Sequence, residues 1–246
     1  MSDIDPPDSK TTDANARAIQ SAWSASSAVR EFSGTHRTIR GLIHIFRPAV
    51  AAAQPADEKR TKAVAKALAI VVEGTRFHHS LEDNDYWPAL IANGADKSLI
   101  EPLMVEHHQL DPILERLDKE AQALAAKPTD EQALSSSKEL FVNLAEHLLT
   151  HLDHEEPIFF PLLARYLSDR EAHTLSVKAG KSAPRTGFSW IMAGTTYAMR
   201  PQEADEFLRA LPKPVVWLRP MLLSRYRKDC AILGIDPEEL SRVNGP

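Results

Sequence analysis

The residues best suited to chemistry in this chain lie in a motif that occurs twice. The first copy spans 78–90 (HHSLEDNDYWPAL) and the second spans 151–163 (HLDHEEPIFFPLL). In each copy a glutamate follows a histidine by four residues, as Glu82 follows His78 and Glu155 follows His151. Residues four apart share one face of an α-helix, so each copy directs an imidazole and a carboxylate to the same point. Two such helices packed face to face would offer the nitrogen and oxygen ligands that first-row transition metals bind.

Four long helices are predicted to position this motif. Apolar residues recur every three or four positions over about 13–46, 55–92, 98–126 and 129–168, with short connections between these segments. Long amphipathic helices joined by short loops favour an all-α fold, an up-down-up-down four-helix bundle.

Each predicted helix places one histidine on its apolar stripe. These residues are His36, His78, His107 and His151. Burying them together with two carboxylates would cost several kcal/mol for each unpaired charge, and a bound cation would remove that cost. The alternative is a polar core that is held by hydrogen bonds between histidine and glutamate alone. We favour the metal site.

This pattern resembles the hemerythrin-like family, the HHE cation-binding domains, over about residues 15–168. The resemblance implies a bundle that holds two non-haem iron ions, with a bridging oxo or hydroxo group between them. By the same resemblance His36 and His78 bind one iron, and His107 and His151 bind the other. Glu82 and Glu155 would bridge the two ions, and two neighbouring cations do need anions between them.

The chain departs from hemerythrin at the fifth histidine, which hemerythrin carries one turn after its first ligand on the third helix. Here that position is Asp111. Asp111 either adds a carboxylate or stays outside the site, and alternatively His147, one turn before His151, supplies the missing nitrogen. We favour His147. We expect His79, His108 and His154 to be solvated or to support the ligands from outside.

Two acidic residues next to the motif glutamates, Asp83 and Glu156, are expected to accept hydrogen bonds from ligand imidazoles. Such bonds would orient the rings towards the metal.

The two ends of the chain differ from the bundle in composition. Residues 1–12 are polar and proline-containing, and we expect a disordered lead-in. Residues 169–246 contain seven prolines and several shorter apolar segments, which predict a C-terminal helical extension. This extension is too apolar for a free tail, so it should dock on the bundle or on a partner subunit.

Composition excludes several other classes of protein. The net charge is −5 and no dense Lys/Arg run occurs, so nucleic acid and membrane surfaces are not expected partners. The single cysteine, Cys230, excludes an internal disulfide and a cysteine-based metal cluster. We see no signal-peptide pattern and no long uncharged apolar run, and we expect a cytoplasmic protein.

Three hypotheses for function follow. The first is a di-iron protein that binds O2, nitric oxide or peroxide for sensing, storage or detoxification. The second is a di-iron oxidoreductase that consumes peroxide or oxidises iron. The third is an iron-responsive interaction module whose segment 169–246 recognises a partner.

Overall fold

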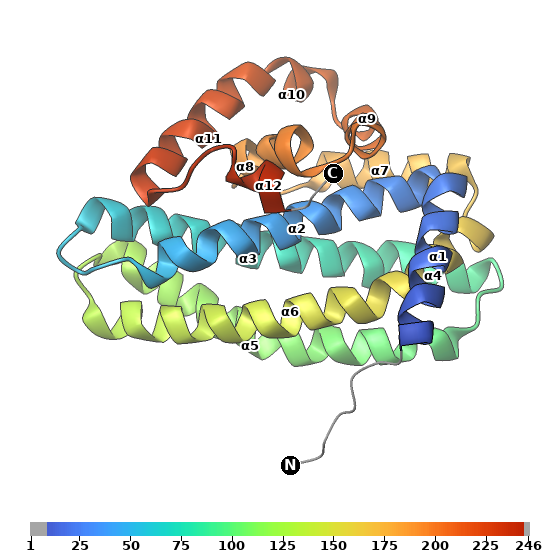
Figure 1. Cartoon of the computed structure of the whole chain (residues 1–246), viewed down its shortest axis with the longest axis horizontal. Coiled ribbons are helices and arrows are strands. Elements are labelled where there is room, and N and C mark those ends of the chain that lie inside the picture. The colour runs from blue at the N-terminus through green and yellow to red at the C-terminus, as the bar shows by residue number, and fades with distance from the viewer. Residues whose placement is uncertain (1–8, 244–246) are drawn as a thin grey trace, which may run out of the picture.

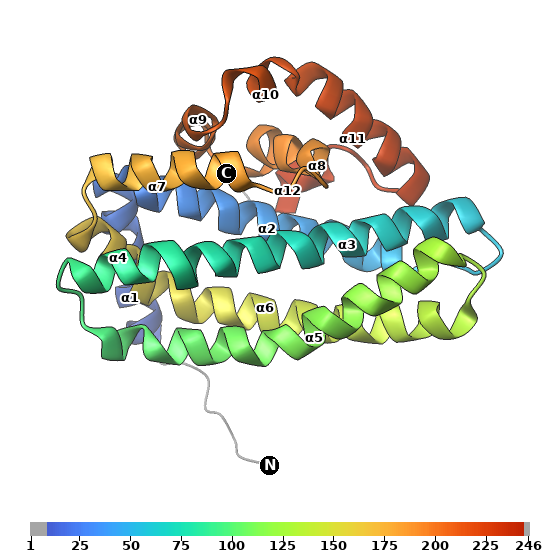
Figure 2. The same cartoon turned by 180° about the vertical axis from the view of Figure 1, so that it is seen from behind.

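The computed structural model describes residues 9–243, and every regular element within them is helical. Four long helical segments lie side by side along the long axis of the molecule (Figure 1). They are α2 (Ser27–Ala51), α3 (Glu58–Leu81) with its continuation α4 (Trp87–Ala92), α5 (Glu101–Ala126) and α6 (Glu131–Tyr166). The connections between successive segments lie at alternate ends of the bundle (Figures 1 and 2). The predicted all-α fold is confirmed.

The second segment changes its helical winding at the repeated motif. Between α3 and α4, residues Glu82–Tyr86 form a π-helical turn that begins at the motif glutamate. Single π-helical turns widen an α-helix locally and are frequent at functional sites. The equivalent stretch of α6 stays α-helical through Pro157 and Pro161, although each proline removes one backbone hydrogen bond.

The first predicted helix is divided in two. α1 (Ser9–Ala25) ends before Ser26, which has an extended backbone conformation. The Ser26 side chain caps α2 by accepting a hydrogen bond from the Val29 N–H. α1 then crosses α6 instead of continuing along α2 (Figure 1). Residues 9–12, predicted to belong to the disordered lead-in, form the start of α1. Residues 1–8 of that lead-in lie outside the described residues.

The C-terminal extension docks on the bundle of its own chain. Its elements are α7 (Asp169–Ser182), α8 (Phe188–Ala193), a π-helical turn (Gly194–Ala198), α9 (Pro201–Ala210), α10 (Lys213–Trp217), α11 (Arg219–Leu233) and α12 (Glu239–Val243). They cover α2 and α3 on one side (Figure 2). Fully buried Glu203 ties α9 to the bundle, because its carboxylate accepts hydrogen bonds from Trp23 Nε1 at 2.8 Å and Ser33 Oγ at 2.9 Å.

The apolar core consists of two clusters, one towards each end of the bundle. One contains residues such as Phe46, Leu68 and Leu144, and the other contains Phe32 and Phe159. Along each of the four long segments, the histidine of the apolar stripe falls between the two clusters. The polar residues of the motif therefore form a layer across the middle of the bundle. None of the described helices is both long and apolar enough to span a membrane.

Candidate metal centre

The polar layer contains two groups of side chains whose ligand atoms converge. The first group is His36, His78, Glu82 and Glu155, and the second is His79, His107 and His151. Within each group one potential ligand atom from every residue lies within 4.8 Å of the others. All of these residues are buried, and the two carboxylates have no exposed surface.

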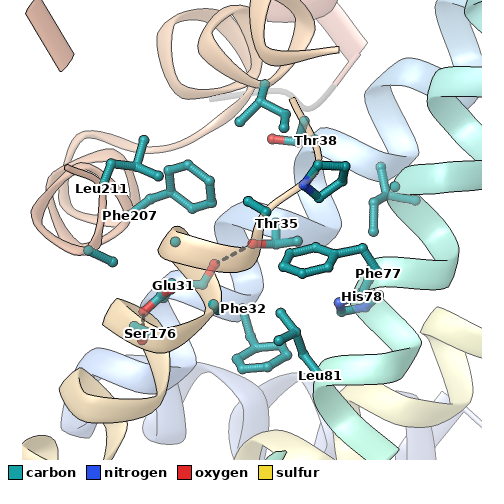
Figure 3. Close-up of a pocket in the computed structure, with 18 of the residues that line it drawn as sticks. Glu31, Phe32, Thr35, Thr38, Phe77, His78, Leu81, Ser176, Phe207 and Leu211 are labelled. Atoms are coloured by element: carbon teal, nitrogen blue, oxygen red, sulfur yellow. Dashed lines mark hydrogen bonds between the residues drawn. The ribbon is translucent and has the colours of Figure 1, made fainter. Parts of the chain in front are cut away.

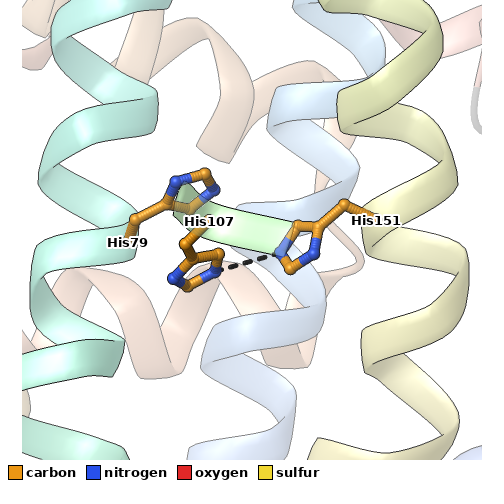
Figure 4. Close-up of side chains that lie close together, drawn as sticks. All are labelled: His79, His107 and His151. Atoms are coloured by element: carbon orange, nitrogen blue, oxygen red, sulfur yellow. Dashed lines mark hydrogen bonds between the residues drawn. The ribbon is translucent and has the colours of Figure 1, made fainter. Parts of the chain in front are cut away.

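Each group contains a close pair of histidines from adjacent helices. In the first, His36 Nε2 lies 3.1 Å from His78 Nε2. In the second, His107 Nε2 lies 3.2 Å from His151 Nε2, and His79 completes the triangle (Figure 4). Nε2 atoms that point at each other in this way can share a cation as ligands.

The two glutamates of the first group also approach the second. Glu82 Oε1 is 3.3 Å from His78 Nε2, while its Oε2 is 3.6 Å from His107 Nε2. Glu155 Oε2 is 3.6 Å from His36 Nε2 and 3.5 Å from His151 Nε2. Each carboxylate therefore reaches one histidine of both groups, which is the position that a bridging ligand requires.

Several buried polar atoms of this layer lack a hydrogen-bond partner. Both carboxylate oxygens of Glu82 and Glu155, and both ring nitrogens of His79, have no hydrogen-bond partner among the described residues. Buried polar atoms in native proteins are nearly always satisfied. Burial, with repulsion from Glu155, raises the pKa of Glu82 well above its usual range. Cations at the two groups would satisfy the orphaned atoms and stabilise both carboxylates in ionised form, so these residues fit metal ions.

The lowered pKa values of two histidines also favour metal binding. Burial lowers the pKa of His78 and of His79 well below the ordinary value, and the neighbouring imidazoles lower it further. Neutral imidazole keeps a lone pair for a metal, whereas imidazolium has none.

The comparisons with known proteins agree with this geometry. The family model described as the hemerythrin HHE cation-binding domain matches residues 27–174, which include every residue of both groups. The chain belongs to this family. No curated protein and no solved structure matches the chain. The resemblance inferred from the repeated motif is confirmed, and the His/Glu layer of this HHE domain is where a cation can be held.

Acidic side chains outside the layer orient the histidines of the HHE domain. His36 Nδ1 donates to Glu156 at 3.1 Å, and His107 Nδ1 donates to Asp83 at 3.0 Å, as predicted for these two acids. Despite the opposing effect of burial, hydrogen bonding to His36, with added attraction from Arg40, lowers the pKa of Glu156 to about 2. An Nδ1 that donates its proton outward leaves Nε2 unprotonated and directed into the layer.

A third acid of this kind, Glu106, was not predicted. Its Oε2 accepts from His151 Nδ1 at 2.8 Å, and its Oε1 accepts from His154 Nδ1 at 3.1 Å. Glu106 lies on α5, just before His107, and reaches across to a histidine of α6. The only indication of this role in the sequence is that Glu106 stands next to His107. Its contact with His151 depends on how α5 and α6 pack, which the sequence does not reveal.

The fifth histidine of the layer is His79, and the preference for His147 is not supported. His147 is exposed, and its Nδ1 donates to the Asn143 carbonyl at 2.9 Å. The buried stripe of α6 runs through Leu148, Leu152 and Glu155, with His151 at its edge. Four residues make a full turn plus about 40°, which from His151 leads into the stripe at Glu155 and out of it at His147. Asp111 is also exposed and lies outside both groups.

His79 was expected to be solvated or to lie outside the ligands, yet only 4% of it is exposed. α3 packs against α2 and also against α5, so two consecutive residues can both face the core. His78 faces His36 of α2, while His79 stacks on His107 of α5 with ring centroids 3.9 Å apart. Trp87 stacks on the His107 ring at 4.6 Å, so aromatic packing fixes the second group.

Proposed function

We propose that this HHE domain holds two iron ions in its polar layer and through them binds a small oxidant, namely O2, nitric oxide or peroxide. The observation that carries this proposal is that Glu82 and Glu155 each reach a histidine of both groups. Two adjacent cations repel each other, and anionic bridges between them offset that repulsion. A layer built for one cation would not need two carboxylates in this position.

The residues divide unequally between the two metal positions. One position has His36 and His78, and the other has His79, His107 and His151. Glu82 and Glu155 group with the first pair, and because each also lies within 3.6 Å of a histidine of the second group, we assign them to both positions. A mixture of imidazole and carboxylate ligands suits iron, although manganese and zinc accept it as well. When bound, a pair of ferrous ions would supply electrons for reduction of the oxidant.

The position with two histidines has fewer protein ligands and is the one that we assign to the exogenous ligand. His78 also lines an apolar cavity beside the bundle. Uncharged O2 and nitric oxide can cross apolar surroundings without losing strong hydration, so this cavity offers them an approach. The aromatic side chains Phe32 and Trp87 pack against the histidines and limit the access of water.

The test begins with metal content. Protein purified without chelator, or reconstituted anaerobically with ferrous iron, should contain about two irons per chain, as two metal positions require. After reduction, addition of O2 should produce new absorption in the near-ultraviolet and visible range. Persistence of that absorption would indicate a carrier or sensor, and its decay would indicate turnover.

Two histidines one turn apart on α6 provide a matched control. His151→Ala removes a buried residue of the layer, and His147→Ala removes an exposed one. We expect His151→Ala to lose iron and the spectral change, while His147→Ala keeps both. Failure of the wild type to bind iron in stoichiometric amounts, or zinc binding without any spectral response, would contradict the redox function.

A second candidate is an iron-oxidising activity, and a surface pocket favours it. Between α5 and α6, a pocket of about 300 Å³ is lined by Glu106, Glu146, His147 and His154, and it reaches His151. These side chains could conduct ferrous ions towards the layer. We expect repeated oxidation of iron beyond two ions per chain, slowed by Glu146→Gln and unaffected by Glu139→Gln on the same helix. Oxidation that stops at two ions per chain would exclude this activity.

A further inference from the structure

A cavity of about 160 Å³ lies between the bundle and the C-terminal extension (Figure 3). α2 and α3 form one wall, while α7, α8 and α9 form the other. Lining residues from Ser176 onward lie beyond the family match, which ends at residue 174. The cavity is therefore a feature that the extension adds to the HHE domain.

Most of the lining is apolar and rich in aromatic side chains. Phenylalanines contribute from both walls, namely Phe32, Phe77, Phe188 and Phe207. Thr35 and Thr38 also line the cavity, but their hydroxyls donate to backbone carbonyls one turn earlier, at 3.1 Å and 3.0 Å. These hydroxyls are already satisfied, so this part of the cavity offers a ligand mainly apolar contact.

The remaining polar groups gather on one side. Ser176 Oγ donates to the Glu31 carboxylate, and Tyr86 Oη lies 3.2 Å from Ser176 Oγ. Figure 3 shows Glu31 and Ser176 together, on the opposite side of the cavity from Phe77 and His78. Burial raises the pKa of Glu31 to about 7; the hydrogen bond from Ser176 opposes the rise, and repulsion from Glu206 adds to it. Near neutral pH this carboxyl can therefore donate as well as accept a hydrogen bond.

We infer that this cavity binds an uncharged molecule of about the size of benzene that carries one hydroxyl group, with phenol as the simplest example. An apolar cavity of roughly 150 Å³ in another protein is known to take up benzene, so the volume is sufficient. Small-molecule sites commonly combine apolar and aromatic walls with a few placed polar groups. The hydroxyl would bond to Glu31, whereas a charged ligand would lose its hydration against the phenylalanines. The inference does not depend on which metal the polar layer holds.

Gly74 provides a way to fill the cavity with little disturbance. It lines the cavity from α3, is exposed, and a Cβ built on it would meet no atom within 4 Å. Gly74→Leu should occupy the space, and Gly74→Ala is the matched control for the change in helix propensity. Ala179→Leu fills the cavity independently from α7.

The experiment is calorimetric titration of full-length, metal-loaded protein with phenol, benzene and benzoate. We expect saturable binding of about one phenol per chain, benzene weaker by about tenfold, and no binding of benzoate. Gly74→Leu and Ala179→Leu should each weaken phenol binding by tenfold or more at unchanged metal content, while Gly74→Ala should bind as the wild type does. Glu31→Leu should abolish the preference for phenol over benzene.

Three results would overturn the inference. The first is phenol binding that does not saturate. The second is wild-type affinity in both filled variants, which would place the phenol elsewhere. The third is a phenolate-to-metal absorption band that survives in the filled variants, which would place the phenol on the metal.

Discussion

Glu31 should make the stability of the protein depend on pH in a way that one substitution can isolate. The pKa of Glu31 rises in the folded protein from an ordinary 4.5 to about 7, mainly through burial. Between these values the folded chain binds the proton more tightly than the unfolded chain does. The stabilising effect is therefore complete below about pH 4.5 and is lost as the pH rises to about 7.

The size of the effect follows from the shift. A pKa difference of this size corresponds to about 3 kcal/mol of unfolding free energy, of which about 2 kcal/mol falls between pH 5 and pH 8. Because Glu31 keeps part of its surface accessible beside the cavity, solvent screening makes these values upper limits.

Glu31→Gln removes the titrating group and keeps both the size of the side chain and an oxygen that can accept from Ser176. Urea unfolding of the wild type and of this variant, at pH 5 and pH 8 with equal metal loading, gives two differences in unfolding free energy. Groups that do not interact with Glu31 titrate in the same way in both proteins, so their contributions cancel. We expect the wild type to lose about 2 kcal/mol relative to the variant between the two pH values. If the difference in unfolding free energy between wild type and variant is the same at pH 5 and pH 8, within about 0.5 kcal/mol, the argument that burial disfavours the charged form of Glu31 is refuted.

Three other substitutions, the first with a matched control, test the layer and the docking of the extension. His79→Ala should weaken metal binding by about tenfold or more. His108→Ala, which removes an exposed residue, should leave the metal titration unchanged. Equal titrations of the two variants would place His79 outside the metal centre. Glu82→Gln removes a buried carboxylate, so it should raise the melting temperature of the metal-free protein and abolish the stabilisation that metal confers. A lower melting temperature of the metal-free variant would contradict the finding that the Glu82 carboxylate has no hydrogen-bond partner. A Cβ at Gly194 would overlap with Thr38 of α2. Gly194→Ala should therefore lower the unfolding free energy by about 1–3 kcal/mol and speed proteolysis of the extension. Proteolysis of the variant at the wild-type rate would show that this contact is not tight.

Sequence alone was sufficient for the features that depend on local periodicity. The spacing of four residues between His78 and Glu82 determines that both side chains share a helix face, whatever surrounds them. The same reasoning placed His36, His107 and His151 on the core-facing stripes, and the structure brings all of these residues into one layer. It also identified Asp83 and Glu156 as acceptors for imidazole N–H groups.

Features that depend on which helices are neighbours could not be predicted in this way. His79 is rotated about 100° from His78, and only the packing of α3 between α2 and α5 turns that second face into core. The helix breaks at Ser26 if packing of α1 across α6 stabilises the protein more than a continuous extension of α2 would. Docking of residues 169–243 creates a cavity whose two walls are separated by 90 residues or more in the chain. The sequence determined which residues each helix presents on a face, because helical geometry is local, and the tertiary structure decided which faces are buried, because burial depends on the partner.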